Sequence, residues 1–306
     1  MVLLTGIATN CTAVLNTLDR YAAPALTPIV VSITIIAGVL IFGGYIGIWA
    51  IVWSTVAGSL LHAMIVARMM HSHGYRFSLR WHGMTKATRE VAMQYGPVLL
   101  SGFVASGGLL VDQAMAAMLP SGSVSALAYA NRFVSVIISL IAGALSSALT
   151  PWFSRAIAHQ DWVICRRTLL TWMGKTATIT VPIAILLMFG SHLLVRIAFQ
   201  RGAFHSADTA VTSRVLTMYA IQIPFFAVSR VFYRFIVAMR RTDVILYCGV
   251  LNLALDVVLN IVFMRFMGVA GIALATSLWT VSTFFFLGYW SRRLLVNAES
   301  QMEQRA

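Results

Sequence analysis

The stretch LLVDQAMAAMLPSGSVSALAYANRF, residues 109–133, decides the fold of this chain. It joins two apolar runs through the short turn Pro120-Ser121-Gly122-Ser123, and each run carries a single charge, Asp112 in the first and Arg132 in the second. A charged side chain at the centre of a bilayer costs about 2.5–3.5 kcal/mol on insertion scales. The pattern therefore predicts two antiparallel membrane helices in which each charge faces a partner, water or a substrate.

The composition of the whole chain indicates an integral membrane protein. Of its 306 residues, 59% are hydrophobic and only 10% are charged, with a mean hydropathy of +0.85, whereas soluble domains carry about 25% charged residues. The formal net charge is +13. Because the basic residues cluster in short segments between apolar runs, this charge fits the positive-inside rule, and no nucleic-acid partner is expected. The three cysteines are scattered without metal-ligand spacing.

The apolar runs predict nine membrane-spanning helices, since one span needs roughly 20 mostly apolar residues. The predicted spans are 1–18, 25–43, 45–67, 91–118, 124–153, 168–190, 207–238, 244–264 and 269–291. Of the 22 lysines and arginines, 14 fall in the loops on one side and three in the loops on the other. The positive-inside rule then predicts a cytoplasmic C-terminus and an N-terminus outside. An outside N-terminus without a basic leader suggests that upstream helices are missing from the chain.

An internal repeat supports the same organisation. The segment Gly44-Tyr45-Ile46-Gly47-Ile48 opens the third predicted span, and Gly268-Val269-Ala270-Gly271-Ile272 opens the ninth. Arg68 and Arg292 close these two spans at matching positions. If the repeat unit is six helices, spans one to three are the second half of one lobe, and spans four to nine form a complete second lobe. Transporters built from such repeats bind substrate between their lobes.

The predicted organisation has four parts. Residues 1–70 form the second half of an N-terminal lobe with three helices, and residues 71–90 form a basic cytoplasmic linker. Residues 91–295 form a complete C-terminal lobe of six helices, and residues 296–306 form a polar cytoplasmic tail.

Four stretches resemble the MurJ/MviN family of lipid II flippases, which belongs to the multidrug, oligosaccharidyl-lipid and polysaccharide exporter (MOP) superfamily. They are LNTLDRYAAPALTPIV (15–30), VDQAMAAMLPSGSVSALAYANRF (111–133), LVRIAFQRGAFHSADTA (194–210) and MGVAGIALATSL (267–278). The resemblance implies a MATE-like, all-α transporter fold in the bacterial cytoplasmic membrane, and a transporter rather than an enzyme. Family members have fourteen helices, so this chain would correspond to helices four to twelve. A separate chain is one source of the missing N-terminal helices.

The same resemblance implies that Ser125 and Arg132 line a central cavity and meet the pyrophosphate of a lipid-linked saccharide. These residues are seven apart, so they share one face of a helix, and the arginine fork suits phosphate oxygens. The alternative is that Arg132 and Asp112 form a structural ion pair. Arg230 and Arg234, one turn apart near the cytoplasmic end of their span, could attract the substrate head group or anionic membrane lipids.

A second group of polar residues predicts a cation site. Asn252, Asp256 and Asn260 recur every four residues and form a polar stripe on one helix. Sodium is a hard ion that prefers oxygen ligands, and the resemblance implies that residues matching Asp112, Asn252, Asp256 and Thr276 supply them. The alternatives are hydrogen bonding between helices and proton coupling through the same carboxylates. No other metal and no required cofactor are expected.

The function that the sequence favours is a lipid II flippase working by alternating access. The alternatives are a flippase for an exopolysaccharide or O-antigen-type lipid-linked oligosaccharide, an inactive or split half-transporter, and a cation-coupled drug antiporter. The charges predicted inside the membrane are five basic and two acidic, which disfavours the antiporter. A membrane enzyme is disfavoured because the short outer loops show no carboxylate pair and no histidine cluster.

Overall fold

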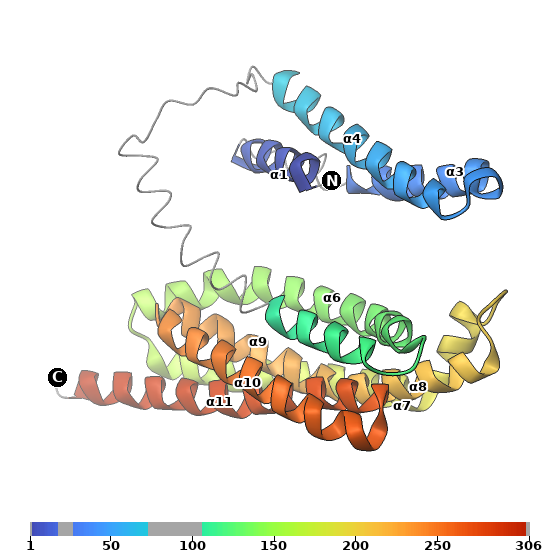
Figure 1. Ribbon diagram of the computed structural model, residues 1–306. Helices are drawn as coiled ribbons and strands as arrows, with labels where there is room; N and C mark the ends of the chain where they lie inside the picture. The colour runs from blue at the N-terminus through green and yellow to red at the C-terminus, as the bar shows by residue number, and fades with distance from the viewer. Residues whose placement is uncertain (1, 18–26, 73–105, 304–306) are drawn as a thin grey trace. The chain divides into compact units, whose positions relative to one another are not determined.

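The computed structural model describes residues 2–17, 27–72 and 106–303, and all regular structure in these ranges is α-helical (Figure 1). The chain divides into two units, Met1–Lys86 and Ala87–Ala306, and each is described by itself. The first unit contains α1 (Val2–Thr17), α3 (Pro28–Ile46) and α4 (Ile48–Ser72). The second unit contains a helical segment at 106–117. It continues with α6 (Ser123–Ala158), α7 (Trp162–Phe199), α8 (Ser206–Ala220), α9 (Gln222–Ala238), α10 (Thr242–Met267) and α11 (Val269–Glu303).

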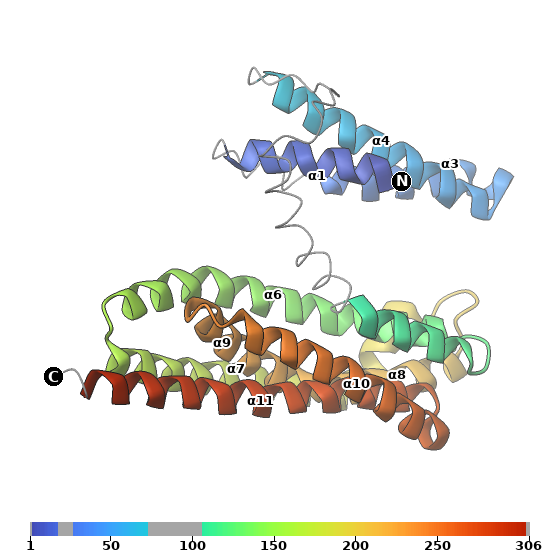
Figure 2. The ribbon, with the colours of Figure 1, turned by 60° about the vertical axis from the view of Figure 1, so that its left-hand side comes forward.

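Small residues hold the first unit together. Helices α3 and α4 form an antiparallel hairpin, in which Gly38 lies against Ser54 and Gly58 lies against the backbone of Val31. Such residues let two helix backbones approach closely in a membrane, where packing replaces the hydrophobic effect. Helix α1 packs on α4 (Figure 2), and Leu15 and Val66 are fully buried there.

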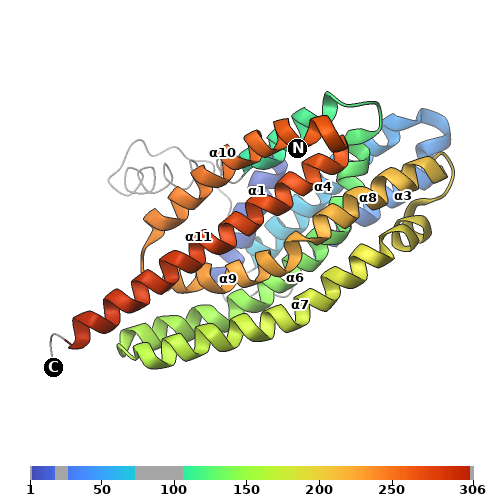
Figure 3. The ribbon, with the colours of Figure 1, turned by 90° about the horizontal axis from the view of Figure 1, so that it is seen from below.

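Helices α8 and α9 form the central span of the second unit. They are separated only by Ile221, and together they contain the most buried apolar segment among the described spans. Both helices pack against α6, α7 and α11, and the view in Figure 3 shows them between α11 and the α6–α7 pair. One apolar core surrounds α8 and a second surrounds α9. The central span therefore supports α6 and α11, and α11 in turn packs along α10.

Each predicted span overlaps helical residues where the structure describes it, although α7 and α11 run beyond the predicted ends. Seven helical segments in the described ranges are long and apolar enough to cross a membrane. The first predicted span corresponds to the shorter helix α1, and the fourth is described only over 106–117. The total of nine spans and the three-plus-six organisation therefore stay predictions. From residue 73 onward, the predicted linker lies outside the described residues, and residues 296–303 of the predicted tail continue α11.

The structure corrects the register of the internal repeat. The turn between α3 and α4 is made by Gly47 with φ +54°, and the turn between α10 and α11 is made by Gly268 with φ +59°. In both turns the glycine N–H donates to the carbonyl four residues earlier, on Gly43 and on Met264. This left-handed conformation favours glycine at each position. Gly47, and not Gly44, is therefore the counterpart of Gly268, a shift of about one helical turn from the sequence match.

Gly271 provides a test of helix packing in the second unit. A methyl group on its Cα would overlap the backbone carbonyl of Phe263, where α11 crosses α10. Because backbone cannot move aside as a side chain can, we expect Gly271→Ala to lower the melting temperature, at a cost of about 1–3 kcal/mol. The control is Gly143→Ala on α6, where nothing lies within 4 Å of the added methyl group, and where alanine favours the helix by up to about 1 kcal/mol. Equal melting temperatures for the two variants would contradict this packing.

Candidate cation and substrate sites

Asp112 is buried and joins three helices through its carboxylate. Its side chain is 6% exposed. Its Oδ1 accepts a hydrogen bond of 2.8 Å from Asn260 Nδ2 on α10, and its Oδ2 accepts one of 3.2 Å from Thr276 Oγ1 on α11. The segment 106–117 is therefore tied to α10 and α11 by polar contacts inside the apolar lobe.

Asn260 extends these contacts to a second buried carboxylate. Its Nδ2 also donates to Asp256 Oδ1 at 3.2 Å, one helical turn away on α10. Asp256 is 2% exposed and Asn260 is fully buried. Two oxygens here, Asp256 Oδ2 and Asn260 Oδ1, are buried without a hydrogen-bond partner. We refer to Asp112, Asp256, Asn260 and Thr276 as the polar cluster.

The residues of the polar cluster could hold a monovalent cation. The cluster contains two carboxylates, and the ion pair found among the described residues is the surface pair Arg241–Asp243, 2.8 Å long. Buried carboxylates are costly unless a positive charge compensates them. Carboxylate, amide and hydroxyl oxygens are the ligands that hard cations prefer. The buried oxygens without partners therefore fit a hard cation such as sodium, while the described residues contain no group of three His, Cys, Asp or Glu that could hold a metal.

The structure brings together three of the four residues predicted for the cation site. Asn252 points to other partners, because its Oδ1 accepts from Thr283 Oγ1 at 3.0 Å and its Nδ2 donates to Cys248 Sγ at 3.6 Å. Asn260, and not the predicted Asn252, is the asparagine in the polar cluster. The sequence contained a signal for this, because Asn260 belongs to the same four-residue stripe as Asp256, but periodicity alone does not show which end of a stripe meets a neighbouring helix.

The alternative of a structural ion pair between Asp112 and Arg132 is wrong. The Asp112 carboxylate accepts hydrogen bonds from Asn260 and Thr276, whereas Arg132 is exposed on α6 within its unit. The two charges of the opening stretch therefore have separate environments, one in the interior of the lobe and one on its surface.

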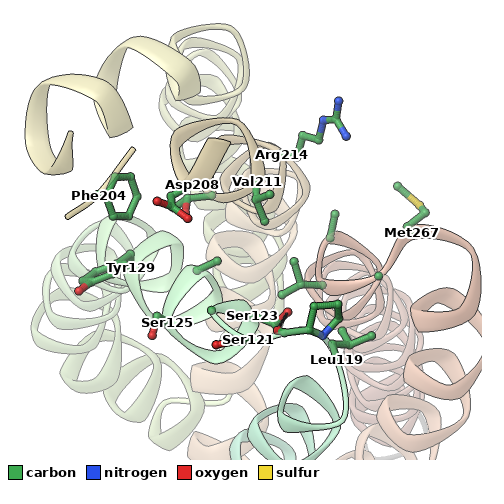
Figure 4. A pocket seen from close by; sticks show the side chains of 17 residues that line it. Leu119, Ser121, Ser123, Ser125, Tyr129, Phe204, Asp208, Val211, Arg214 and Met267 are labelled. Atoms are coloured by element: carbon green, nitrogen blue, oxygen red, sulfur yellow. Dashed lines mark hydrogen bonds between the residues drawn. The ribbon is translucent and has the colours of Figure 1, made fainter. Parts of the chain in front are cut away.

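Ser125 and Arg132 are both exposed on α6, and Tyr129 lies between them on the same side of the helix. Ser125 and Tyr129 line a cavity of about 380 Å³ formed by the starts of α6, α8 and α11 (Figure 4). Phe204 and Asp208 lie on the opposite wall from Ser125, and the Arg214 side chain extends away from these groups. Arg132 is not among the residues that line this cavity. Ser125 and Arg132 are therefore both exposed on α6, and only Ser125 lines this cavity. Their contact with a substrate in a central cavity stays a prediction.

Arg230 and Arg234 on α9 are half-buried and lie against aromatic rings. The Arg230 guanidinium carbon is 4.4 Å from the ring centre of Phe226 and 5.5 Å from that of Tyr233. The Arg234 guanidinium carbon is 5.6 Å from the Tyr233 ring centre. Such cation–π contacts are worth about 0.5–2 kcal/mol. They hold two positive charges side by side in an otherwise apolar span.

Comparison with known proteins identifies the family. A model of the lipid II flippase MurJ family matches residues 1–304. The chain belongs to the MurJ family. Probable lipid II flippases MurJ from Rickettsia prowazekii and Thermotoga maritima are 24% and 27% identical to it, over 87% and 89% of this chain and 52% and 54% of theirs. The chain thus spans about half the length of the curated relatives that it matches.

Solved structures confirm the fold predicted for this member of the MurJ family. A lipid II flippase MurJ in an inward closed conformation matches with a TM-score of 0.82 and 25% identity, over 94% of this chain and 60% of that one. An inward-facing MATE-family multidrug transporter of the MOP superfamily matches with a TM-score of 0.83 at 11% identity, over 97% of this chain and 69% of that one. The second likeness shows the fold alone. The all-α, MATE-like membrane fold expected from the sequence is therefore confirmed.

Proposed function

We propose that this protein takes part in moving a lipid-linked pyrophosphoryl saccharide, with lipid II as the first candidate, across the bacterial cytoplasmic membrane by alternating access. The observation that carries the proposal is Arg132. It is exposed on α6 as the only charged residue of the apolar segment Ser123–Leu145, in a chain matched over residues 1–304 by the MurJ family. An exposed arginine in a membrane span needs an anionic partner or water.

The chemistry of α6 suits a pyrophosphate. The planar arginine guanidinium can donate two parallel hydrogen bonds to phosphate oxygens, which is the geometry that Arg132 offers. Ser125, two turns away on the same face, offers a hydroxyl that can donate to another oxygen of the head group or to a sugar. We infer that the two side chains hold the head group while the lipid tail stays in the bilayer.

Arg230 and Arg234 extend this role towards the cytoplasmic end of the lobe. Their stacking on Phe226 and Tyr233 keeps two guanidinium groups one turn apart, which suits a doubly charged pyrophosphate or the head groups of anionic membrane lipids. We propose that they attract the head group from the inner leaflet before it reaches Arg132. The distribution of basic loop residues supports a cytoplasmic C-terminus in this proposal.

We propose that the polar cluster binds a sodium ion that is coupled to transport, with protons as the other candidate. The cation, with its single positive charge, would offset part of the negative charge of the two buried carboxylates of Asp112 and Asp256. Thr276 contributes a hydroxyl oxygen from α11, so the site joins segment 106–117, α10 and α11. A site shared by three helices can favour one arrangement of the lobe over another, which is what coupling requires.

The substrate class can be tested by binding. The full chain in lipid nanodiscs should bind a polyprenyl-pyrophosphoryl saccharide more tightly than the corresponding lipid monophosphate, and the difference should shrink as salt is raised, because screening weakens exposed charge pairs. Fluorescently labelled lipids allow both dissociation constants to be measured by competition. Lipid II and an O-antigen-type oligosaccharide lipid, compared directly, distinguish the two saccharide classes. Equal affinity for pyrophosphate and monophosphate lipids would contradict the proposal.

A further inference from the structure

Only the NH₂ group of the Asn260 amide is hydrogen-bonded, and its oxygen is not. Its Nδ2 donates to Asp112 Oδ1 at 2.8 Å and to Asp256 Oδ1 at 3.2 Å, so both of its amide hydrogens are engaged. Its Oδ1 is buried and has no hydrogen-bond partner. A fully buried amide that satisfies two carboxylates and leaves its own acceptor unused is unusual, because each buried polar atom without a partner costs about 1–3 kcal/mol.

The bridge explains how two buried carboxylates lie close together in the lobe. The NH₂ group is the positive end of the amide dipole, and it lies between oxygens of Asp112 and Asp256. Thr276 supplies one further donor, to Asp112 Oδ2, while Asp256 Oδ2 has no hydrogen-bond partner. Gly108 on segment 106–117 leaves room beside that oxygen, because a methyl group there would come within 3.3 Å of it.

An amide can exchange its donor and acceptor ends by turning about its last side-chain bond. This torsion, between an sp³ and an sp² carbon, is broad and roughly two-fold, so the two orientations are of similar conformational energy. In the orientation observed, the NH₂ group engages the carboxylate oxygens. After a half turn, Oδ1 would face the same oxygens, which is repulsive unless a positive charge lies between them.

The geometry points to Asn260 as a cation-responsive bridge and a further ligand of the cation site, an inference that rests on the proposed binding of sodium to the polar cluster. The NH₂ bridge and a sodium ion compete for the same oxygens of Asp112 and Asp256. Sodium displaces the bridge, and Asn260 turns to present its Oδ1, the oxygen that has no other partner. Asn260 thereby converts cation binding into a change in the link between segment 106–117 and α10.

Asn260→Asp separates the two functions of the side chain, because it keeps the shape and the acceptor but removes the donor. A carboxylate cannot bridge Asp112 and Asp256, so the variant should melt at a lower temperature than the wild type in choline chloride. A third carboxylate should also strengthen sodium binding. At pH 8, we therefore expect a larger rise in melting temperature on replacing choline by sodium, and an apparent sodium dissociation constant about tenfold lower than that of the wild type.

The matched control is Gln222→Glu, another buried amide in the same unit, whose Oε1 accepts from Thr280 Oγ1 at 3.4 Å. This variant should lower the melting temperature equally in sodium and in choline. If Asn260→Asp behaves in the same way, while the wild type responds to sodium, Asn260 is only a structural residue and the inference is wrong. If the wild type itself does not respond to sodium, the proposed sodium site fails, and the inference fails with it.

A spectroscopic measurement on the wild type covers the case in which Asn260→Asp does not fold. In protein labelled with ¹⁵N at asparagine, titration with sodium chloride should shift the side-chain NH₂ resonances that are lost in Asn260→Ser, and choline chloride should leave them in place. Resonances of Asn260 that stay unchanged while sodium stabilises the protein would overturn the bridge.

Discussion

Replacing Arg132 with glutamate should reduce export of the lipid-linked precursor by at least ten- to a hundredfold. The reason is that a hydrogen bond to a charged group is worth about 1.5–3 kcal/mol, equivalent to about ten- to more than a hundredfold in affinity, and the glutamate also repels the pyrophosphate. Arg132 is exposed on α6 and forms no ion pair with Asp112 or with another residue in the described ranges, so the variant should fold normally. Export can be measured as the fraction of precursor that is accessible from outside the cell.

The control for Arg132 is Arg196→Glu, which reverses an exposed charge on α7. We expect this variant to export the precursor at the wild-type rate. Arg132→Lys should lie between the wild type and Arg132→Glu, because lysine keeps the charge but loses the planar fork. Export by Arg132→Glu equal to that of Arg196→Glu would remove Arg132 from the mechanism.

Replacing Asp112 with alanine should abolish stabilisation of the protein by sodium. The wild type, saturated at a hundred times its dissociation constant, gains about 2.7 kcal/mol from binding a single ion. Asp112→Ala removes one carboxylate of the site and two hydrogen bonds, those from Asn260 Nδ2 and Thr276 Oγ1, although both groups keep a second acceptor, Asp256 Oδ1 and the carbonyl of Ile272. The variant should therefore be less stable than the wild type by about 1.5–3 kcal/mol for each hydrogen bond to the charged group that is lost, and its melting temperature should be the same in sodium and in choline chloride.

The control for Asp112 is Asp243→Ala, which removes a carboxylate from the exposed pair with Arg241. Exposed ion pairs contribute little to stability, so this variant should keep both the stability and the sodium response of the wild type. A sodium response in Asp112→Ala as large as that of Asp243→Ala would show that the ion binds elsewhere.

Much of the fold could be predicted from the sequence, because membrane helices can be recognised by their length and apolar composition. Sequence patterns predict the turn at Pro120–Ser123. They also predict the polar stripe with a spacing of four residues that consists of Asn252, Asp256 and Asn260. Hydrophobicity also explains why α8 and α9 were predicted as one span, since the interruption at Ile221 changes neither their composition nor their direction in the figures.

The parts that escaped prediction depend on how helices rotate and cross. Residues four apart drift by about 40° around a helix axis, so a stripe does not reveal whether Asn252 or Asn260 meets Asp112. Tertiary packing decides this, through the close approach of Gly107 to Leu253 and of Gly108 to Asp256. The register of the internal repeat could not be predicted for a similar reason. Sequence identity between two segments does not show whether Gly44 or Gly47 has the positive φ of Gly268.

The central claim is that this protein moves a lipid-linked pyrophosphoryl saccharide across the cytoplasmic membrane. The most direct test is to deplete the protein in its own bacterium and to measure the precursor in each leaflet, by labelling intact spheroplasts and then lysed ones. The account predicts that the total precursor rises while the fraction accessible from outside falls, and that restoring the wild-type protein, but not Arg132→Glu, reverses both changes. An accessible fraction that is unchanged after depletion, for every lipid-linked saccharide of the cell, would contradict the account.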